Sequence, residues 1–265
     1  MKDSLEPASI LRGLRTRFVG RPLLYHPSLP STMEEARGEA VKGAGEGTVV
    51  LAGEQTAARG RLGRAWLSPQ GSLALSIVLR PDLDHLPGLV MVASLAVVNA
   101  VEAVTGLSPR IKWPNDVLIG SGKVCGILIE SYLRGSAVDY AILGLGINVN
   151  LDPKALALPA RPSFSPDPTS LSAELGREVP RGGLLRVLLE EVERLYLSLL
   201  AGEPLHIPWR ERLETLGREV TVVAGEVEEK GTAEDVTADG SLLLRRADGT
   251  LARIVAGEVS LRSRS

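Results

Sequence analysis

Three arginines lie close together in the stretch ARGRLGRAW, at positions 59, 61 and 64. A guanidinium group suits phosphate, because its planar fork binds two oxygens at once. The glycines between the arginines let the backbone flex, and the like charges repel one another when no anion neutralises them. The pattern predicts a loop that is mobile when empty, and leaves open whether the loop holds nucleic acid, a small phosphate compound or no ligand.

A second set of reactive side chains lies in the motif KWPND at 112–116. Its proline fixes one backbone angle and pushes the preceding tryptophan into extended backbone, so the motif predicts a rigid strand end that presents its lysine, asparagine and aspartate. Lys123 follows a GSG turn, in a strand that returns alongside. Regular alternation would place Lys123 opposite residue 119 or 120. A bulge or twist is therefore needed to bring Lys123 to Asp116; otherwise the segment is an ordinary hairpin with exposed charges.

Gly144 and Gly146 interrupt the apolar stretch GLGINVN. Glycine in a strand removes a side chain and lets a ligand lie against the backbone, although a sheet bulge explains the same pattern. Asn148 offers donors and an acceptor, which suits the edge of an adenine. The stretch is not a dinucleotide-binding fingerprint, because the third glycine is missing, and the chain contains no P-loop motif.

The composition excludes several classes of protein. The 265 residues carry 30 basic and 32 acidic side chains, a net charge of −2, so no overall field draws the chain to nucleic acid or anionic lipid. The three histidines are not at metal-ligand spacing, and the single cysteine, Cys125, forms no internal disulfide, which fits a reducing cytosol. The N-terminus lacks a signal-peptide core, and the apolar run 89–98 is too short to cross a bilayer. We therefore expect a cytoplasmic protein without membrane contact.

Hydrophobic periodicity predicts helices and strands in alternation up to about residue 215. The apolar helix among them should be buried across a sheet. From about Leu216 the pattern changes to short alternating strands with Asp-Gly turns, typical of a small β-barrel. These features predict one domain over residues 1–215 and a second over 216–265. Helices are expected at 9–18, 31–43, 86–106, 169–176 and 184–202, strands at 47–55, 71–81, 108–131 (two strands) and 140–150, and a surface loop at 151–168.

Five motifs together carry a resemblance to a known family: STM from Ser31, GEQTAARGRLGRAW at 53–66, KWPND, KVCGILIE from Lys123 and GLGIN at 144–148. Their order and spacing resemble biotin–protein ligases over about residues 20–200, and the likeness extends to the terminal GEVSLR. The resemblance implies an α+β fold like that of class II aminoacyl-tRNA synthetases, with a mixed sheet, helices and an SH3-like C-terminal barrel. Only about 20 residues precede the resemblance, so we expect no DNA-binding domain and no nucleic-acid partner.

The resemblance also implies a reaction in two steps. The biotin carboxylate attacks the α-phosphate of ATP, which gives biotinyl-5′-AMP and pyrophosphate. The amine of one lysine of a biotin carboxyl carrier protein then attacks the mixed anhydride, and AMP leaves. Both steps gather negative charge, so cationic side chains and Mg²⁺ are expected to stabilise it. Family members occur as monomers and as dimers, so a homodimer stays open.

The residues that match the family's motifs have implied roles. Lys123 would stabilise the reacting phosphorus and Asp116 would orient the acceptor lysine; with Arg59 and Arg61 they are the expected catalytic residues. Met33 stands where the family often has Asn or Gln, so its backbone is the better candidate for a contact. No metal ligands are assigned. The expected biotin-binding residues are Ser31, Thr32, Met33, Gln55, Arg59, Gly60, Arg61, Lys123, Gly126 and Gly144, and the expected ATP-binding residues are Arg61, Arg64, Trp66, Lys112, Asn115 and Asn148.

Two alternatives from different classes stay open. A lipoate–protein ligase shares the fold and the adenylate chemistry, but would lack KWPND together with this loop and barrel. A non-catalytic regulator that binds nucleotide or nucleic acid would use the arginine loop as its contact and the barrel as its binding module. An acyl-adenylate formed with biotin or with lipoate separates the ligases, and a salt-dependent gel shift without biotin or ATP would favour the regulator.

Overall fold

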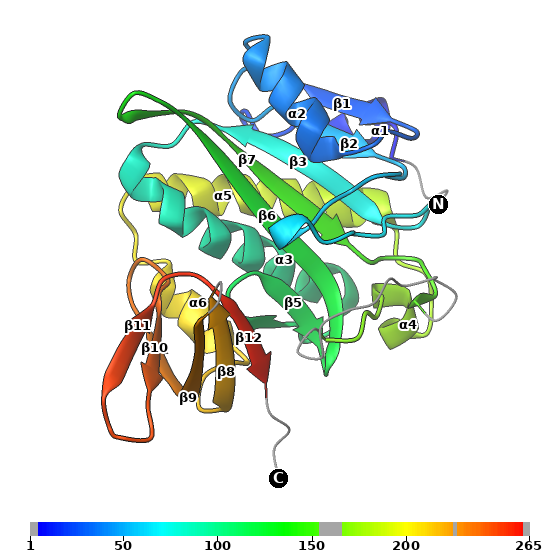
Figure 1. The fold of residues 1–265 in the computed structure, drawn as a ribbon. Coiled ribbons are helices and arrows are strands. Elements are labelled where there is room, and N and C mark those ends of the chain that lie inside the picture. The colour runs from blue at the N-terminus through cyan, green and yellow to red at the C-terminus, as the bar shows by residue number, and fades with distance from the viewer. Residues whose placement is uncertain (1–4, 154–165, 225–226, 262–265) are drawn as a thin grey trace.

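The computed structural model describes residues 5–153, 166–224 and 227–261. Its larger sheet has seven strands in the order β1-β2-β3-β7-β6-β5-β4 (Figure 1). β1 and β2 are parallel and every other neighbouring pair is antiparallel, so the sheet is mixed, as expected. The strands are β1 (Leu23–His26), β2 (Val49–Ala52), β3 (Leu73–Leu79), β4 (Arg110–Lys112), β5 (Asp116–Ile119), β6 (Gly122–Arg134) and β7 (Ala137–Ile147).

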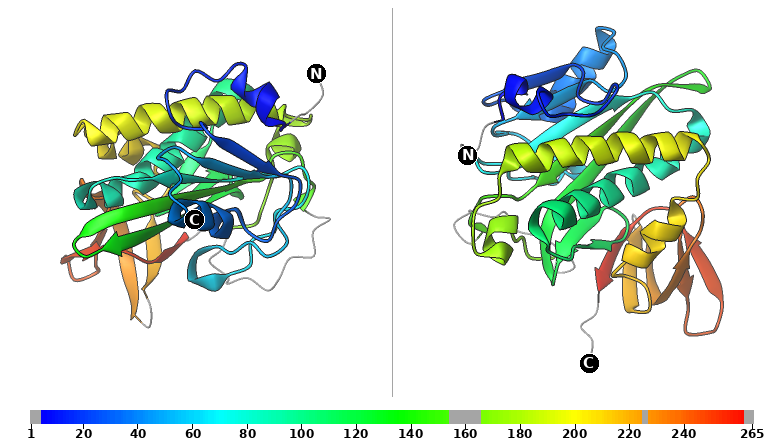
Figure 2. Two further views of the ribbon diagram at one scale, coloured as in Figure 1. Left: turned by 90° about the horizontal axis from the view of Figure 1, so that it is seen from above. Right: turned by 180° about the vertical axis from the view of Figure 1, so that it is seen from behind.

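Helices cover the two faces of this sheet unequally (Figure 2). α3 (Leu89–Thr105) and α5 (Arg181–Leu200) lie together on one face, where the odd-numbered residues of β3 pack into the same core. α2 (Thr32–Val41) covers the opposite face over β2, β3 and β7, above Ala74 and Val78. This alternation along β3 is the period of two that a strand with two covered faces requires. Over β6, β5 and β4 the second face is not covered by α2.

The most apolar helical stretch runs from Leu83 to Thr105, through a short 3₁₀ segment into α3. By length and composition it is able to cross a membrane, but 67% of its most apolar window is buried inside the protein. α3 packs against α5 and the sheet, and residues on most of its faces are buried. It is therefore the buried core helix that the sequence predicts.

One row of paired residues runs across four strands on the face that α2 leaves open. Lys112 on β4 pairs with Asp116 on β5, which pairs with Gly126 on β6, which pairs with Gly146 on β7. Directly paired residues point to the same face of a sheet, so a lysine, an aspartate and two glycines lie side by side there. The row forms a trough with small residues at its floor and charges at its β4 end.

The C-terminal part of the chain forms a second sheet. Its five antiparallel strands follow the order β11-β10-β9-β8-β12, and α6 (His206–Arg212) precedes them. The expected run of short strands is confirmed. Among the described residues, strand pairing leaves this sheet open between β11 and β12, so its closure into a barrel stays a prediction. The strands are β8 (Glu219–Ala224), β9 (Val227–Val236), β10 (Leu242–Arg245), β11 (Leu251–Ile254) and β12 (Glu258–Leu261).

The tryptophan of the KWPND motif joins the two sheets. Trp113 is almost fully buried, and its indole N–H donates to the carbonyl of Gly240 at 2.9 Å. Its backbone N–H donates to the hydroxyl of Thr215, also at 2.9 Å, and the N–H of Glu214 donates to the carbonyl of Ile111 at 2.8 Å. The motif that presents Lys112 and Asp116 therefore also anchors the second sheet, and this anchoring brings β12 to the trough.

Three local expectations differ from the structure. The helix expected at 9–18 is only α1 (Pro7–Leu11), because the backbone N–H groups of residues 17–19 donate to the carboxylate of Glu193 on α5 and cannot form helical hydrogen bonds. The strand β1 was not expected. The segment 108–131 holds three strands instead of two, because the Trp113–Pro114 turn separates β4 from β5. Of the loop expected at 151–168, residues 154–165 lie outside the described part of the chain.

Candidate active site

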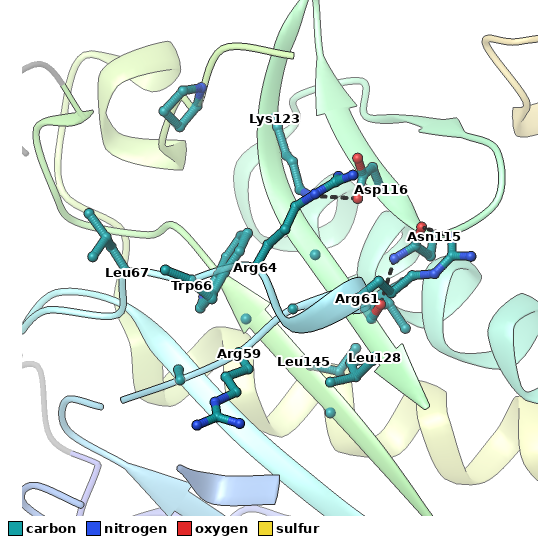
Figure 3. A pocket seen from close by; sticks show the side chains of 18 of the residues that line it. Arg59, Arg61, Arg64, Trp66, Leu67, Asn115, Asp116, Lys123, Leu128 and Leu145 are labelled. Atoms are coloured by element: carbon teal, nitrogen blue, oxygen red, sulfur yellow. Dashed lines mark hydrogen bonds and ion pairs between the residues drawn. The ribbon is translucent and has the colours of Figure 1, made fainter. Parts of the chain in front are cut away.

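A cavity of about 280 Å³ lies in the trough, between α2, the arginine loop at 58–66 and the start of β12. Figure 3 shows side chains that line it, among them the three arginines, Asp116 and Lys123. Every site residue expected from the sequence lines it, and Gly146 does so as well. The structure thus brings together motifs that lie as far apart in the sequence as Ser31 and Asn148. The gathered residues are Ser31, Thr32, Met33, Gln55, Arg59, Gly60, Arg61, Arg64, Trp66, Lys112, Asn115, Asp116, Lys123, Gly126, Gly144 and Asn148.

The neutral end of the pocket consists of Ser31, Thr32 and Gln55, with Ser76 of β3 beneath them. The backbone N–H and the hydroxyl of Thr32 both donate to the side-chain oxygen of Gln55, at 2.8 and 3.0 Å. The hydroxyl of Ser76 donates to the hydroxyl of Thr32 at 2.8 Å. No hydrogen bond among the described residues uses the NH₂ group of Gln55, which is therefore free to donate to a carbonyl oxygen of a ligand.

Glycines form the floor, and protein side chains lie directly on it. A Cβ atom on Gly146 would lie 2.5 Å from the indole nitrogen of Trp66, and one on Gly126 would lie 3.0 Å from the same ring. A Cβ atom on Gly144 would lie 2.4 Å from the sulfur of Met33. The sequence led us to expect a ligand against these glycines. Instead Trp66 and Met33 take that space, so the Met33 side chain, and not only its backbone, shapes the pocket.

The charged end consists of Arg64, Lys112, Asp116, Lys123 and Glu258. The ammonium of Lys123 lies 2.6 Å from a carboxylate oxygen of Asp116 and 5.2 Å from the centre of the Trp66 ring. A bulge makes the first contact possible: Val117 pairs with Cys125, but the next residue of β5, Leu118, pairs with Lys123. The irregularity that the sequence requires for this contact is therefore confirmed.

A strap from the segment after residue 165 holds Lys123 from the other side. The N–H of Lys123 donates to the carbonyl of Asp167 at 2.7 Å, and the N–H of Thr169 donates to the carbonyl of Lys123 at 2.9 Å. The NH₂ group of Asn148 donates to the carbonyl of Thr169 at 2.9 Å and reaches that of Lys123 at 3.4 Å. Asn148 therefore fixes the strap, and no hydrogen bond within the described part of the chain uses its side-chain oxygen.

Lys112 is the most buried cation of the charged end, with 5% of its surface exposed. Burial disfavours the charged form and lowers the pKa of its ammonium. The carboxylates of Asp116 and Glu258 act in the opposite direction, while Lys123 and Arg64 add to the effect of burial. The net result is a lysine whose pKa lies below its ordinary value, directly across from Asp116 in the β4–β5 pair.

The arginines of the loop do not share one direction. Arg61 donates to the side-chain oxygen of Asn115 at 3.1 Å and to the carbonyl of Gly257 at 3.2 Å, and Arg64 forms an ion pair with Glu258. Arg59 points away from both (Figure 3). We expected the arginines to repel one another in the absence of a ligand. The second sheet compensates this repulsion, because Gly257 and Glu258 accept from two of them; mobility of the empty loop stays a prediction.

Comparisons with known proteins show which family this chain is similar to. Residues 25–148 match the model of the biotin/lipoate A/B protein ligase family, and residues 215–262 match that of the biotin protein ligase C-terminal domain. The bifunctional ligase/repressor BirA of Bacillus subtilis is 34% identical over 97% of this chain and 79% of its own length. The biotin--[acetyl-CoA-carboxylase] ligase of Mycobacterium tuberculosis is 32% identical, over 97% of both chains. The chain belongs to the biotin protein ligase family.

A solved structure of the family supports the same conclusion. The biotin protein ligase from Aquifex aeolicus, in complex with biotin and ATP, superposes with a TM-score of 0.74 and 29% identity over 91% of this chain and 99% of its own. The family and the ligase activity expected from the sequence are confirmed. The match to a biotin protein ligase C-terminal domain favours a biotin ligase over the lipoate ligase alternative. Because the relatives are ligases, the alternative of a non-catalytic regulator is not supported.

Sequence reasoning missed part of this ligase site. Glu258 and Val259 of β12 line the pocket, although no residue of the GEVSLR stretch was assigned to it. The signal was present in the resemblance of that stretch, but the partner of Glu258 is Arg64, far away in the sequence. Asn115, expected at the nucleotide, has both side-chain groups in use: its oxygen accepts from Arg61, and its NH₂ donates to the carbonyl of Ile127 at 2.7 Å.

Proposed function

We propose that this chain activates biotin with ATP in the trough and transfers it to a lysine of a biotin carboxyl carrier protein. The observation that carries the proposal is the division of one pocket into a neutral end and a charged end. Ser76 on β3 and Asp116 on β5 are separated by β7 and β6, and Asp116 lies in the row of Ala74, two residues along β3 from Ser76. At normal strand spacing and rise this places them about 16 Å apart. That span suits a ligand with a polar uncharged head, a short chain and a carboxylate.

The neutral end fits the ureido ring of biotin. The ring presents one carbonyl oxygen and two N–H groups. The NH₂ of Gln55 is available for the carbonyl, and the hydroxyls of Ser31 and Thr32 line the same end for the N–H groups. The sulfur of Met33 and the side chains of Leu128 and Leu145 supply apolar walls for the ring and chain.

The charged end fits the first step. An oxygen of the biotin carboxylate forms a bond to the α-phosphorus of ATP, and pyrophosphate leaves. Lys123 would exchange Asp116 for the α-phosphate and stabilise the charge that builds on it, and the fork of Arg64 would bind the phosphate oxygens. Arg61 and Arg59, with Gly60 between them, would close the lid over the adenylate.

The second step uses the same end. The carboxylate of Asp116, released from Lys123, would accept a hydrogen bond from the incoming lysine amine and hold it toward the acyl carbon. The amine nitrogen bonds to the acyl carbon while the acyl–oxygen bond to the phosphate breaks, and AMP leaves. Trp66, held over Gly126 and Gly146, would carry the nucleotide through both steps.

Mg²⁺ would enter with the triphosphate of ATP. No group of three His, Cys, Asp or Glu side chains within the described ranges is close enough to hold a metal ion alone. The carboxylates at the charged end, Asp116 and Glu258, are both paired with cations. Mg²⁺ at nucleotide sites is usually bound by phosphate oxygens together with one or two carboxylates, and the small number of carboxylates here fits that arrangement. The ion would neutralise the phosphates and the leaving pyrophosphate.

The finer architecture is part of the proposal. A division into a catalytic domain at 1–215 and a C-terminal domain at 216–265 is supported by the family match that begins at residue 215. Closure of the second sheet into an SH3-like barrel is supported by its antiparallel order, in which β8 lies between β9 and β12. A cytoplasmic location is supported by the single buried cysteine. Light scattering tests whether two copies associate.

The test is formation of the adenylate followed by transfer. The purified chain is incubated with ATP, MgCl₂ and either biotin or lipoate, and mass spectrometry detects the acyl-adenylate. A recombinant biotin carboxyl carrier domain is then added. We expect biotinyl-AMP, and a carrier heavier by one biotinyl group. Formation of lipoyl-AMP without biotinyl-AMP, or no adenylate with either acid, would refute the proposal.

A further inference from the structure

Asp116 lies between two lysines that reach it in different ways. Lys123 forms a direct ion pair with it at 2.6 Å, made possible by the bulge in β6. Lys112 is its cross-strand partner in the β4–β5 pair, so the two side chains start from neighbouring positions on the same face of the sheet. Lys112 is 5% exposed, whereas 19% of the Lys123 side chain is exposed. One carboxylate is thus flanked by an accessible ammonium and a buried one.

We infer that the two lysines divide the two half-reactions: Lys123 serves adenylate formation, and Lys112 takes up, through Asp116, the proton that the acceptor amine loses during transfer. This inference rests on the proposed function. It assigns Lys112, which the resemblance placed at the nucleotide, to the acceptor step. Lys112 would act through Asp116 and not by contact with the acceptor lysine.

The transfer step needs a proton acceptor. A lysine amine is protonated at neutral pH and attacks only after it loses a proton. A carboxylate is a far weaker base than an amine, so a proton that reaches Asp116 needs a further acceptor beside it. A second group beside it, able to exist as a neutral amine, completes the relay. Burial of Lys112 favours its neutral form, and the charges facing it come as two carboxylates, Asp116 and Glu258, and two cations, Lys123 and Arg64.

The step balances without a further reactant. The nitrogen of the acceptor lysine forms a bond to the acyl carbon of biotinyl-AMP, and the acyl–oxygen bond to the phosphate breaks. The acceptor ammonium gives its first proton to water before the attack, and a second proton leaves the nitrogen for a carboxylate oxygen of Asp116 as the bond to the acyl carbon forms. Asp116 then passes a proton to the neutral amine of Lys112. AMP leaves with the electron pair of the broken bond. Lys112 returns its proton to water when the products depart.

The deciding variant is Lys112→Arg, because arginine keeps the positive charge but does not deprotonate in proteins. Adenylate formation is measured by pyrophosphate exchange, and transfer by mixing the isolated enzyme–biotinyl-AMP complex with a biotin carboxyl carrier domain in a single turnover. We expect the loss in transfer to exceed the loss in adenylate formation at least tenfold. The wild-type transfer rate should fall as pH decreases through the titration of Lys112, and the variant should lose this dependence. The matched control is Lys230→Arg, because Lys230 is an exposed lysine of the second sheet that forms an ion pair with Glu228.

Hydroxylamine separates proton transfer from other effects. It is largely unprotonated at neutral pH and attacks acyl-adenylates directly, so it needs no base. With hydroxylamine as acceptor, the Lys112→Arg complex should react at the wild-type rate. Equal losses in both half-reactions, an unchanged pH profile of transfer, or an equal defect with hydroxylamine would each overturn the inference. If the wild-type chain forms no adenylate, the proposed function fails instead. Circular dichroism checks that the Lys112→Arg variant is folded. The second variant, Lys112→Gln, has no amine to take up the proton, so it must show the same defect in transfer.

Discussion

At the neutral end of the pocket, Thr32, Gln55 and Ser76 are joined by hydrogen bonds between uncharged groups. At the charged end, the contacts are ion pairs between oppositely charged side chains. Lys123 is held by Asp116, and Arg64 by Glu258. The neutral network leaves a donor of Gln55 ready for a ligand. The charged network must exchange partners before it can bind one.

This difference indicates two kinds of binding. The neutral end is preformed, so a ligand there gains hydrogen bonds without breaking any. At the charged end, an anion of the substrate replaces Asp116 as the partner of Lys123, and the lid can close only when that exchange occurs. Variants at the two ends should therefore affect different steps, and the comparison can be broken or sharpened one substitution at a time.

Lys123→Ala should have the largest effect. It removes the ammonium that would stabilise the α-phosphate, and loss of one such group costs about a hundredfold to a thousandfold in rate. Pyrophosphate exchange should fall by about a thousandfold. Biotin affinity, measured by calorimetry, should change little, because the neutral end is intact. Unchanged exchange, or a loss of biotin binding as large as the loss of rate, would break the comparison.

Thr32→Val should act at the other end. It removes the hydroxyl that donates to Gln55 and accepts from Ser76, and leaves the buried Ser76 hydroxyl without this partner, while the Gln55 oxygen keeps the bond from the backbone N–H of Thr32. A buried unsatisfied group costs about 1–3 kcal/mol, so the Kd for biotin should rise about thirtyfold. The KM for ATP should stay within about twofold. Retained biotin affinity, or an equal weakening of ATP binding, would contradict the separation between the two ends. The control is Thr56→Val, because Thr56 lies outside the pocket.

Gly146→Ala should affect the nucleotide more than biotin. The new methyl group would lie 2.5 Å from the indole nitrogen of Trp66 and must displace the ring. Overpacking of this kind costs about 1–3 kcal/mol, so the KM for ATP should rise about tenfold, and tryptophan fluorescence should shift. Gly38→Ala on α2 is the matched control, because no atom lies within 4 Å of its added methyl group. An unchanged KM would show that Trp66 has no part in nucleotide binding.

Glu258→Ala should have the smallest effect. Its carboxylate orients Arg64 through one of the guanidinium nitrogens. Partly exposed ion pairs contribute up to about 1 kcal/mol, so the KM for ATP should rise about threefold, with the biotin Kd unchanged. Glu258→Gln, which can still accept from Arg64, should lie closer to wild type. The control is Glu228→Ala, at a half-exposed position of the second sheet, which should have no effect on the KM for ATP. A lower KM for ATP in Glu258→Ala would show instead that Glu258 competes with phosphate.

The sequence predicts the site better than the fold. The residues expected to do chemistry lie in short motifs, so their identities were readable, and all of them line one pocket. Strand alternation indicated that contact between Asp116 and Lys123 needs a bulge or twist, but left an ordinary hairpin open, and the structure contains the bulge. Helix and strand order was compatible with the family fold, but only the resemblance selected it.

Features that depend on distant contacts were not predictable. The place of Glu258 in the pocket follows from the anchoring of the second sheet by Trp113, which no local pattern encodes. α1 ends early because Glu193, far along the chain, takes the N–H groups that follow it. The side chain of Asn115 holds Arg61 and Ile127, so its type suggested nucleotide binding while its contacts are with the protein.

Biotin-dependent exchange of labelled pyrophosphate into ATP tests the central claim most directly, because it requires both ends of the pocket in one turnover. The account predicts rapid exchange when biotin, ATP and MgCl₂ are all present and background exchange when biotin is omitted. It also predicts that Thr32→Val recovers the wild-type rate at high biotin concentration, while Lys123→Ala does not recover at any. Exchange that is independent of biotin, or that Lys123→Ala retains, would contradict it.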